Sequence, residues 1–229
     1  MRNVSLCLAA AALVWIPGAA QADGLLYQLP KDGSWARYVV ETPDGPIDAS
    51  LTMASVGRET VDGHDCRWIE VKLEVTNDSG TETWVLKCLV PERHLGKGKD
   101  PLSHVVRAWH KRSAGEPAML TNLAERGILP TTIGGPLHEA AELDQEIVRS
   151  KLGELACKGI TGYNEFQDGE TDVRVTYRTR LNEKAPFGVV NAMITLETRA
   201  NGQVTQSRSA KVTLSDYGET ALSELPGFE

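Results

Sequence analysis

The sequence predicts a mainly β (α+β) fold, an antiparallel sheet with one or two helices on one side. Most segments alternate apolar and polar residues with the period of two that is typical of strands, and short turns rich in Gly, Asn and Asp separate them. These connections have the length of hairpin turns, which favours an antiparallel sheet over a parallel α/β fold with its longer crossovers. One segment in the middle of the chain has the spacing of an amphipathic helix instead.

The N-terminal segment has the pattern of a secretory signal peptide. Arg2 precedes an apolar run from Val4 to Ile16, and the small residues of Ala20-Gln21-Ala22 follow, so we expect cleavage after Ala22. The run is too short for a comfortable transmembrane helix, and no later stretch approaches that length. We therefore expect a signal peptide at 1–22, a single β-rich domain at 23–229, and an exported protein, periplasmic or extracellular, without a transmembrane segment.

Charge and cysteine content limit the classes of function. Removal of residues 1–22 would leave 207 residues, with 23 basic and 31 acidic side chains and a formal charge of −8. This charge disfavours nucleic-acid binding, where neutralisation of phosphates is the main attractive term. The remaining cysteines, Cys66, Cys88 and Cys157, allow at most one internal disulfide, so the hydrophobic core must stabilise the fold.

Residues 35–90 predict a four-stranded antiparallel meander, with strands at 35–42 and 47–53 followed by a hairpin. The hairpin gives the clearest signal, because apolar and polar residues alternate on both sides of the turn formers Asn77 to Gly80. A loop of this length pairs Ile69 with Cys88 and keeps each pair on that face apolar. Cys66 then points to the opposite face, and a disulfide with Cys88 would require a bulge or another turn. We interpret Cys88 as a core residue, with the disulfide as the alternative.

Two helices are predicted between the two groups of strands. Apolar residues at 102–109 follow the i, i+3, i+4, i+7 spacing of an amphipathic helix. Pro101 suits the first turn of this helix, and Asp100 is a candidate N-cap. The segment from Leu137 to Leu143 predicts a second, short helix. The apolar stripe of the first helix consists of Leu102, Val105, Val106 and Trp109.

Strands return near Gln145. The dipeptide Asn201-Gly202 is favoured in two-residue hairpin turns and predicts that the last two strands form a hairpin. The tail from Glu219 to Glu229 lacks periodicity, so we expect it to be loosely held. The predicted strands lie at 146–149, 152–162, 172–181, 189–198 and 204–214.

Two runs in the C-terminal half, Leu152 to Lys158 (LGELACK) and Glu183 to Val190 (EKAPFGVV), carry a family resemblance. They resemble exported bacterial domains of uncharacterised families whose sheets are similar to the lipoprotein carriers LolA and LolB. The resemblance implies a strongly curled antiparallel sheet that forms an open half-barrel, with helices across its concave face. In the carriers that concavity holds acyl chains. No ligand-contact residue of a carrier has a match here, so the resemblance supports the fold more than the function.

The candidate ligand-binding residues are two tryptophans and two arginines, Trp35, Trp68, Arg174 and Arg178. The tryptophans are candidates to line a ligand cavity, with core packing as the alternative. In the predicted hairpin, Trp68 shares the polar face with Glu70 and Lys72, so it is either exposed or covered by another element. The arginines belong to a basic row on one strand face, which suits an anionic headgroup or simply a solvated surface.

No motif for catalysis, a metal or a cofactor is present. The sequence lacks G-x-S-x-G, H-E-x-x-H, a phosphate loop and a dinucleotide fingerprint. Cys66, close to His64 and Arg67, is the sole candidate for a reactive thiol, and a structural thiol is the alternative. We therefore predict a non-enzymatic domain that binds an apolar ligand or acyl chain in a curled sheet. The alternative is a periplasmic structural or protein-interaction module with a filled core and no ligand.

Overall fold

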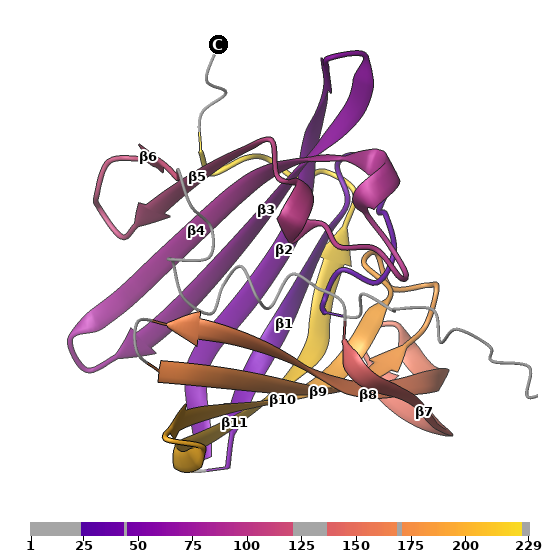
Figure 1. The fold of residues 1–229 in the computed structure, drawn as a ribbon. Helices are drawn as coiled ribbons and strands as arrows, with labels where there is room; N and C mark the ends of the chain where they lie inside the picture. The colour runs from indigo at the N-terminus through magenta and orange to yellow at the C-terminus, as the bar shows by residue number, and fades with distance from the viewer. Residues whose placement is uncertain (1–23, 44, 121–136, 169–170, 226–229) are drawn as a thin grey trace, which may run out of the picture.

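A computed structural model describes residues 24–43, 45–120, 137–168 and 171–225 of the chain. The strands are β1 (Trp35–Thr42), β2 (Gly45–Val61), β3 (His64–Asn77), β4 (Gly80–Pro91), β5 (Arg107–Arg112), β6 (Ala118–Met119), β7 (His138–Ser150), β8 (Gly153–Asp168), β9 (Thr171–Leu181), β10 (Val189–Ala200) and β11 (Gln203–Gly218). All eleven belong to one antiparallel sheet, in the order β6-β5-β4-β3-β2-β1-β11-β10-β9-β8-β7 (Figure 1). The sheet is open, with β6 and β7 at its two edges.

The predicted four-stranded meander is confirmed. Strands β1 to β4 pair consecutively, and β3 pairs with β4 in the predicted register, with Ile69 opposite Cys88. Cys66 lies opposite Pro91, and the three cysteines in the described residues are buried and unbridged, so the disulfide alternative is excluded there. The pattern of apolar residues and the turn thus specify the same register.

The strands predicted in the C-terminal half are also confirmed, with longer bounds. The β10–β11 turn places Asn201 at φ 52° and Gly202 at φ 75°, both in the left-handed region that a two-residue hairpin turn with a matching twist requires. The strand predicted at 146–149 is part of β7, which begins at His138.

The helix predicted at 102–109 is wrong. Its first turn is a short 3-10 helix, η2 (Leu102–His104), and the chain then forms β5, which pairs with β4. The Asp100 carboxylate accepts a hydrogen bond from the backbone N–H of Ser103 at 3.2 Å, but the N-cap residue of η2 is Pro101, so the predicted N-cap position of Asp100 is wrong. Val105 and Val106 are β-branched neighbours that favour extended backbone, and pairing with β4 decides the conformation.

The short helix predicted from Leu137 to Leu143 is wrong as well. This stretch of good helix formers enters the edge strand β7, which pairs with β8. Helix propensity amounts to a few tenths of a kcal/mol per residue, and the ladder of hydrogen bonds to β8 outweighs it. The described residues contain no α-helix, and their helical turns are the two 3-10 helices η1 (Glu92–His94) and η2, so no helix lies across a face of this part of the sheet.

The two halves of the sheet meet where β1 pairs with β11. Strands β1 to β4 run steeply through the view of Figure 1, whereas β8 to β10, in orange, run across it. Buried residues of both halves form one hydrophobic cluster that includes Tyr38, Ile69 and Tyr177. The Tyr38 hydroxyl donates a hydrogen bond to the carbonyl oxygen of Val189 at 3.2 Å, which ties β1 to β10. We call the face that carries these residues the inner face and the opposite one the outer face.

Candidate functional site

The four predicted ligand-binding residues all lie on the outer face. Alternation along β1 and β3 places Trp35 and Trp68 opposite the buried residues Ala36 and Ile69. On β9, the same alternation places the two arginines opposite Val175 and Tyr177, which are completely buried. The structure therefore brings the tryptophans to one half of the sheet and the arginines Arg174 and Arg178 to the other half.

Trp68 is half-buried, and two cations lie over its ring. The Nζ atom of Lys87 is 5.1 Å from the centroid of the Trp68 ring, and the guanidinium carbon of Arg107 is 5.6 Å from it. Both distances suit cation–π attraction. In the described residues, the groups that lie over the Trp68 ring are therefore these two cations, one from β4 and one from β5.

The C-terminal segment 219–225 leaves β11 and runs across the outer face toward β4 (Figure 1). The Glu70 carboxylate accepts hydrogen bonds from the Ser223 hydroxyl at 2.7 Å and from the backbone N–H of Glu224 at 2.9 Å. Lys87 donates to the carbonyl oxygen of Leu225 at 3.2 Å, and Leu225 is fully buried. The tail predicted to be loose is therefore held at 219–225, and residues 226–229 lie outside the described ones.

This contact buries two opposite charges on the outer face. Glu70 is 3% exposed and Lys87 is 4% exposed, and they face each other in the β3–β4 ladder. Burial lowers the pKa of Lys87, and the Glu70 carboxylate acts in the opposite direction. Glu70 and Lys87 look like ordinary solvated strand residues in the sequence, because the residues that cover them are more than 130 positions away.

A pocket of about 250 Å³ remains between the segment and β1–β3. Its charges are mutually neutralised, since Lys72 Nζ lies 2.6 Å from a carboxylate oxygen of Glu224 and Arg37 lies 3.6 Å from Glu74. Its wall includes Trp35 on the strand side and Ala221 and Leu222 on the segment side.

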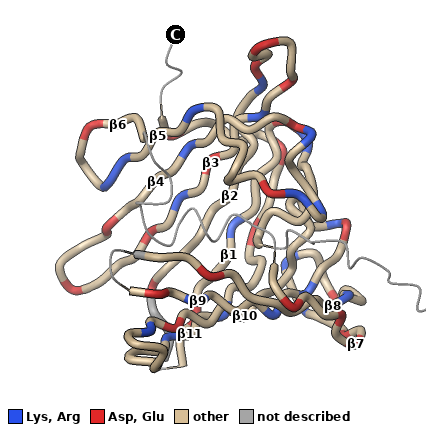
Figure 2. The backbone as a smooth tube through the Cα atoms, viewed as in Figure 1, with Lys and Arg blue, Asp and Glu red and all other residues tan. Residues whose placement is uncertain are grey.

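The basic row on β9 is largely neutralised. Arg174 pairs with Glu165 at 2.5 Å and its guanidinium stacks 4.1 Å from the Tyr163 ring, while Arg180 pairs with Glu146 at 2.5 Å. Arg178 alone in this row has no ion-pair partner among the described residues. Figure 2 shows acidic and basic residues interspersed over both halves of the sheet, so the row does not form a basic patch.

The inner face divides into a filled centre and a half-buried margin. The centre is packed with bulky side chains such as Tyr38, Tyr177 and Phe187, each with no exposed surface. On β3 the inner-face residues are buried as far as Val71 and half-buried at Leu73 and Val75. On β10 they are buried as far as Ala192 and half-buried beyond it, at Ile194 and Leu196. These four residues, Leu73, Val75, Ile194 and Leu196, pack against the common core, and we call them the apolar margin.

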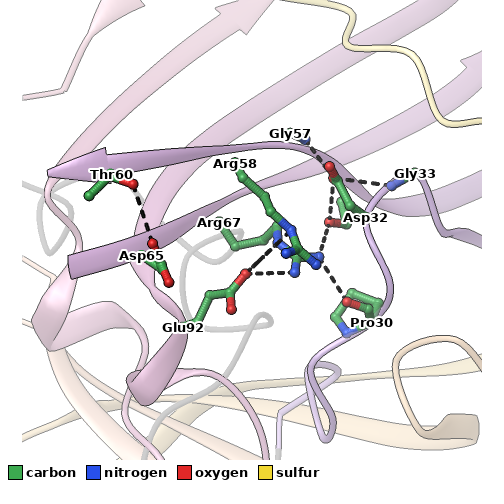
Figure 3. Close-up of polar contacts among 10 residues, drawn as sticks. Pro30, Asp32, Gly33, Gly57, Arg58, Thr60, Asp65, Arg67 and Glu92 are labelled. Carbon is green, nitrogen blue, oxygen red and sulfur yellow. Dashed lines mark hydrogen bonds and ion pairs between the residues drawn. The ribbon is translucent and has the colours of Figure 1, made fainter. Parts of the chain in front are cut away.

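A buried arginine, Arg67, lies on the inner face near the start of β3, at the opposite end of this strand from the apolar margin (Figure 3). Arg67 is 1% exposed and donates to the carbonyl of Pro30 at 2.8 Å, to the Ser55 hydroxyl at 2.9 Å, and through Nε and Nη2 to Glu92 at 3.0 and 2.6 Å. These bonds tie the N-terminal segment, β2 and η1 to β3. The predicted register already placed Arg67 on the face of Ile69, but its role was missed because an arginine breaks an apolar pattern.

Asp32 extends this network to the next turn (Figure 3). One carboxylate oxygen of Asp32 accepts hydrogen bonds from the backbone N–H groups of Gly57 at 2.9 Å and Gly33 at 3.1 Å, and from the Ser55 hydroxyl at 3.3 Å. Because the donors of Arg67 and the acceptor oxygen of Asp32 are already hydrogen-bonded to protein groups, the network stabilises the fold. It leaves few hydrogen-bonding groups for a ligand.

The thiols do not have the setting of a nucleophile. Burial raises the pKa of the Cys66 thiol, which lies 3.5 Å from the backbone carbonyl of His64, and raises that of Cys88 to about 12. A reactive cysteine requires a lowered pKa. Within the described ranges, no three His, Cys, Asp or Glu side chains are grouped so as to hold a metal ion. The same ranges contain no helix that is long and apolar enough to cross a membrane.

Comparisons with known proteins find distant matches among solved structures. No protein-family model matches the chain, and no curated protein matches it. A protein from Parabacteroides distasonis, provisionally assigned as a lipoprotein, is 10% identical over 86% of this chain and 100% of its own, with a TM-score of 0.43. A protein from Bacteroides fragilis, provisionally assigned as exported and described as having a YmcC-like fold, is 8% identical over 84% and 99%, with a TM-score of 0.41. Neither match carries information about function.

Proposed function

We propose that this chain is an exported, non-enzymatic β-rich domain that binds an apolar ligand, such as an acyl chain, along the apolar margin of its inner face. The observation that carries the proposal is that the inner face presents four apolar side chains where it is no longer fully buried, at Leu73 and Val75 on β3 and at Ile194 and Leu196 on β10. A ligand that covers such residues gains about 25 cal/mol for each Å² of apolar surface removed from water.

In this proposal the open sheet curls into a half-barrel whose concave side is the inner face. Support comes from the single core, to which strands of both halves contribute. The proposed export rests on the signal-peptide pattern of residues 1–22, and the absence of catalysis rests on the buried, high-pKa thiols. Trp35, Trp68, Arg174 and Arg178 lie on the outer face, so their predicted role in ligand binding concerns a different surface.

The alternative is a structural or protein-interaction module with a filled core. The complete burial of Tyr38, Tyr177 and Phe187 favours it, because these side chains occupy the centre of the inner face. The two functions differ in one respect: a ligand-binding domain takes up an apolar molecule at the margin, and a filled module takes up none.

Native mass spectrometry of the protein purified from its own membrane-containing extract tests the proposal. We expect a co-purifying lipid, and saturable uptake of a fluorescent fatty acid by the delipidated protein. Ile194→Asn should weaken this uptake about tenfold, because it places a polar group within the apolar margin. Met193→Asn is the matched control on the outer face of the same strand and should leave uptake unchanged. A bare mass without fatty-acid uptake would exclude the apolar ligand and favour the filled module.

A further inference from the structure

The C-terminal segment contacts the outer face in the way a bound peptide contacts a receptor. Three side chains of the sheet, Glu70, Lys72 and Lys87, form hydrogen bonds with its last three described residues. The Ser223 hydroxyl and the Glu224 N–H bind Glu70, the Glu224 carboxylate binds Lys72 at 2.6 Å, and the Leu225 carbonyl binds Lys87. In peptide recognition, backbone contacts of this kind give affinity and side-chain contacts give specificity.

Glu70 and Lys87, which make these contacts, allow the segment to dissociate from the sheet. Glu70 and Lys87 are buried when the segment lies over them, and the hydrogen bonds that the structure shows for their charged groups go to the segment. A buried charge without partners is costly, whereas a charge at an open surface is solvated by water. Glu70 and Lys87 therefore have hydrogen-bond partners in both states: the segment when it is bound, and water when it has dissociated.

The segment fills the groove incompletely. The pocket of about 250 Å³ beside Trp35 lies directly under Ala221 and Leu222. Leu222 is 88% exposed, and the one apolar residue of the segment that is fully buried is Leu225. A peptide with a larger side chain beside this pocket has about 250 Å³ to occupy, in addition to the contacts that the segment makes.

We propose that the outer face of β1–β4 is a peptide-binding groove that recognises a hydroxyl–acidic–leucine segment of a partner protein, and that residues 223–225 occupy this groove as an intramolecular competitor. This site is separate from the apolar margin, which lies on the other face. A partner peptide gains access by displacing the segment, so its apparent affinity depends on the fraction of molecules in which the groove is open.

Fluorescence anisotropy with the full chain and a fluorescein-labelled synthetic peptide of residues 219–225 tests the proposal. We expect saturable binding that becomes about tenfold tighter for the Leu225→Ala chain, because its own segment competes less well. Glu70→Gln should weaken binding about tenfold or more. A peptide with the Ser223→Ala change should also bind more weakly, a result that does not depend on the folding of a variant chain. Arg178→Gln, on the outer face of the other half, is the matched control and should bind as the wild type does.

Three results would overturn the proposal. One is the absence of saturable binding to both the wild-type and the Leu225→Ala chain. Another is binding that neither Glu70→Gln nor the Ser223→Ala peptide weakens, which would place the peptide elsewhere. The third is a concentration-dependent dimer of the wild-type chain that Leu225→Ala abolishes, which would assign the groove to the tail of a second copy.

Discussion

The outer faces of the two halves of the sheet carry similar charged residues, which are partly exposed on one half and buried on the other. On β8–β10, Arg174 and Glu165 pair at 2.5 Å with 29% and 48% of their side chains exposed. On β3–β4, Glu70 and Lys87 are almost fully buried under the C-terminal segment. The difference indicates that the cover over a strand, rather than its composition, decides whether its charged residues are buried.

The largest decrease in the free energy of unfolding is expected for Glu70→Ala. This change leaves the buried Lys87 without its opposite charge and removes two hydrogen bonds to the segment, so unfolding should become easier by about 3 kcal/mol. Urea denaturation of the variant against the wild type measures this free energy. Replacement of both residues, Glu70→Leu with Lys87→Leu, should recover most of the loss, because an apolar pair requires no charged partner. A double variant as unstable as Glu70→Ala would contradict this account.

An intermediate effect is expected for Leu225→Ala. Loss of its buried side chain should lower the free energy of unfolding by about 2 kcal/mol, provided that the segment adds to global stability. Leu222→Ala is the matched control, since Leu222 is exposed and its truncation should change stability by less than about 0.5 kcal/mol. Thermal unfolding followed by circular dichroism compares the two variants. Equal effects at both positions would show that the segment is not docked as described.

The smallest effect is expected for Glu165→Ala on the uncovered half. Its ion pair with Arg174 is partly exposed and screened by salt, so the loss should stay below about 1 kcal/mol. The same urea measurement, repeated at high salt, should bring the variant and the wild type closer together. A loss as large as that of Glu70→Ala would remove the distinction between the two outer faces.

The sequence predicted the turns and strand registers, which depend on residues close together in the chain. It missed the burial of strand residues by segments that are distant in the sequence. The turn residues and the alternation of faces along each strand were sufficient to pair Ile69 with Cys88 and to place Asn201-Gly202 in a hairpin. The helix predicted at 102–109 failed because pairing with β4 overrides a local apolar stripe. Local pattern had no means of showing that Glu70 is buried, since the residues that cover it, Ser223 and Glu224, lie more than 150 positions away.

Of the candidate site, the sequence predicted that Trp68 lies on the outer face and left open whether it is exposed or covered by another element. It also predicted the neighbouring basic residues on β9, but their acidic partners, such as Glu165 on β8, become visible once the strands are paired. The apolar margin on the inner face was missed as a separate region. Alternation identifies which face a residue is on, and it does not report how far along a strand the core extends.

The pairing of β1 with β11 has a consequence for how the chain matures. Trp35 lies opposite Gly218, so β1 acquires its second neighbour after nearly the whole chain has emerged from the ribosome or from a secretion channel. Until then β1 presents an unpaired edge, which is a template for aggregation. Such late closure of a long-range pairing slows folding. For the export proposed above, a chain that stays unfolded for longer remains competent for translocation, and this topology delays completion of the sheet until β11 has paired with β1.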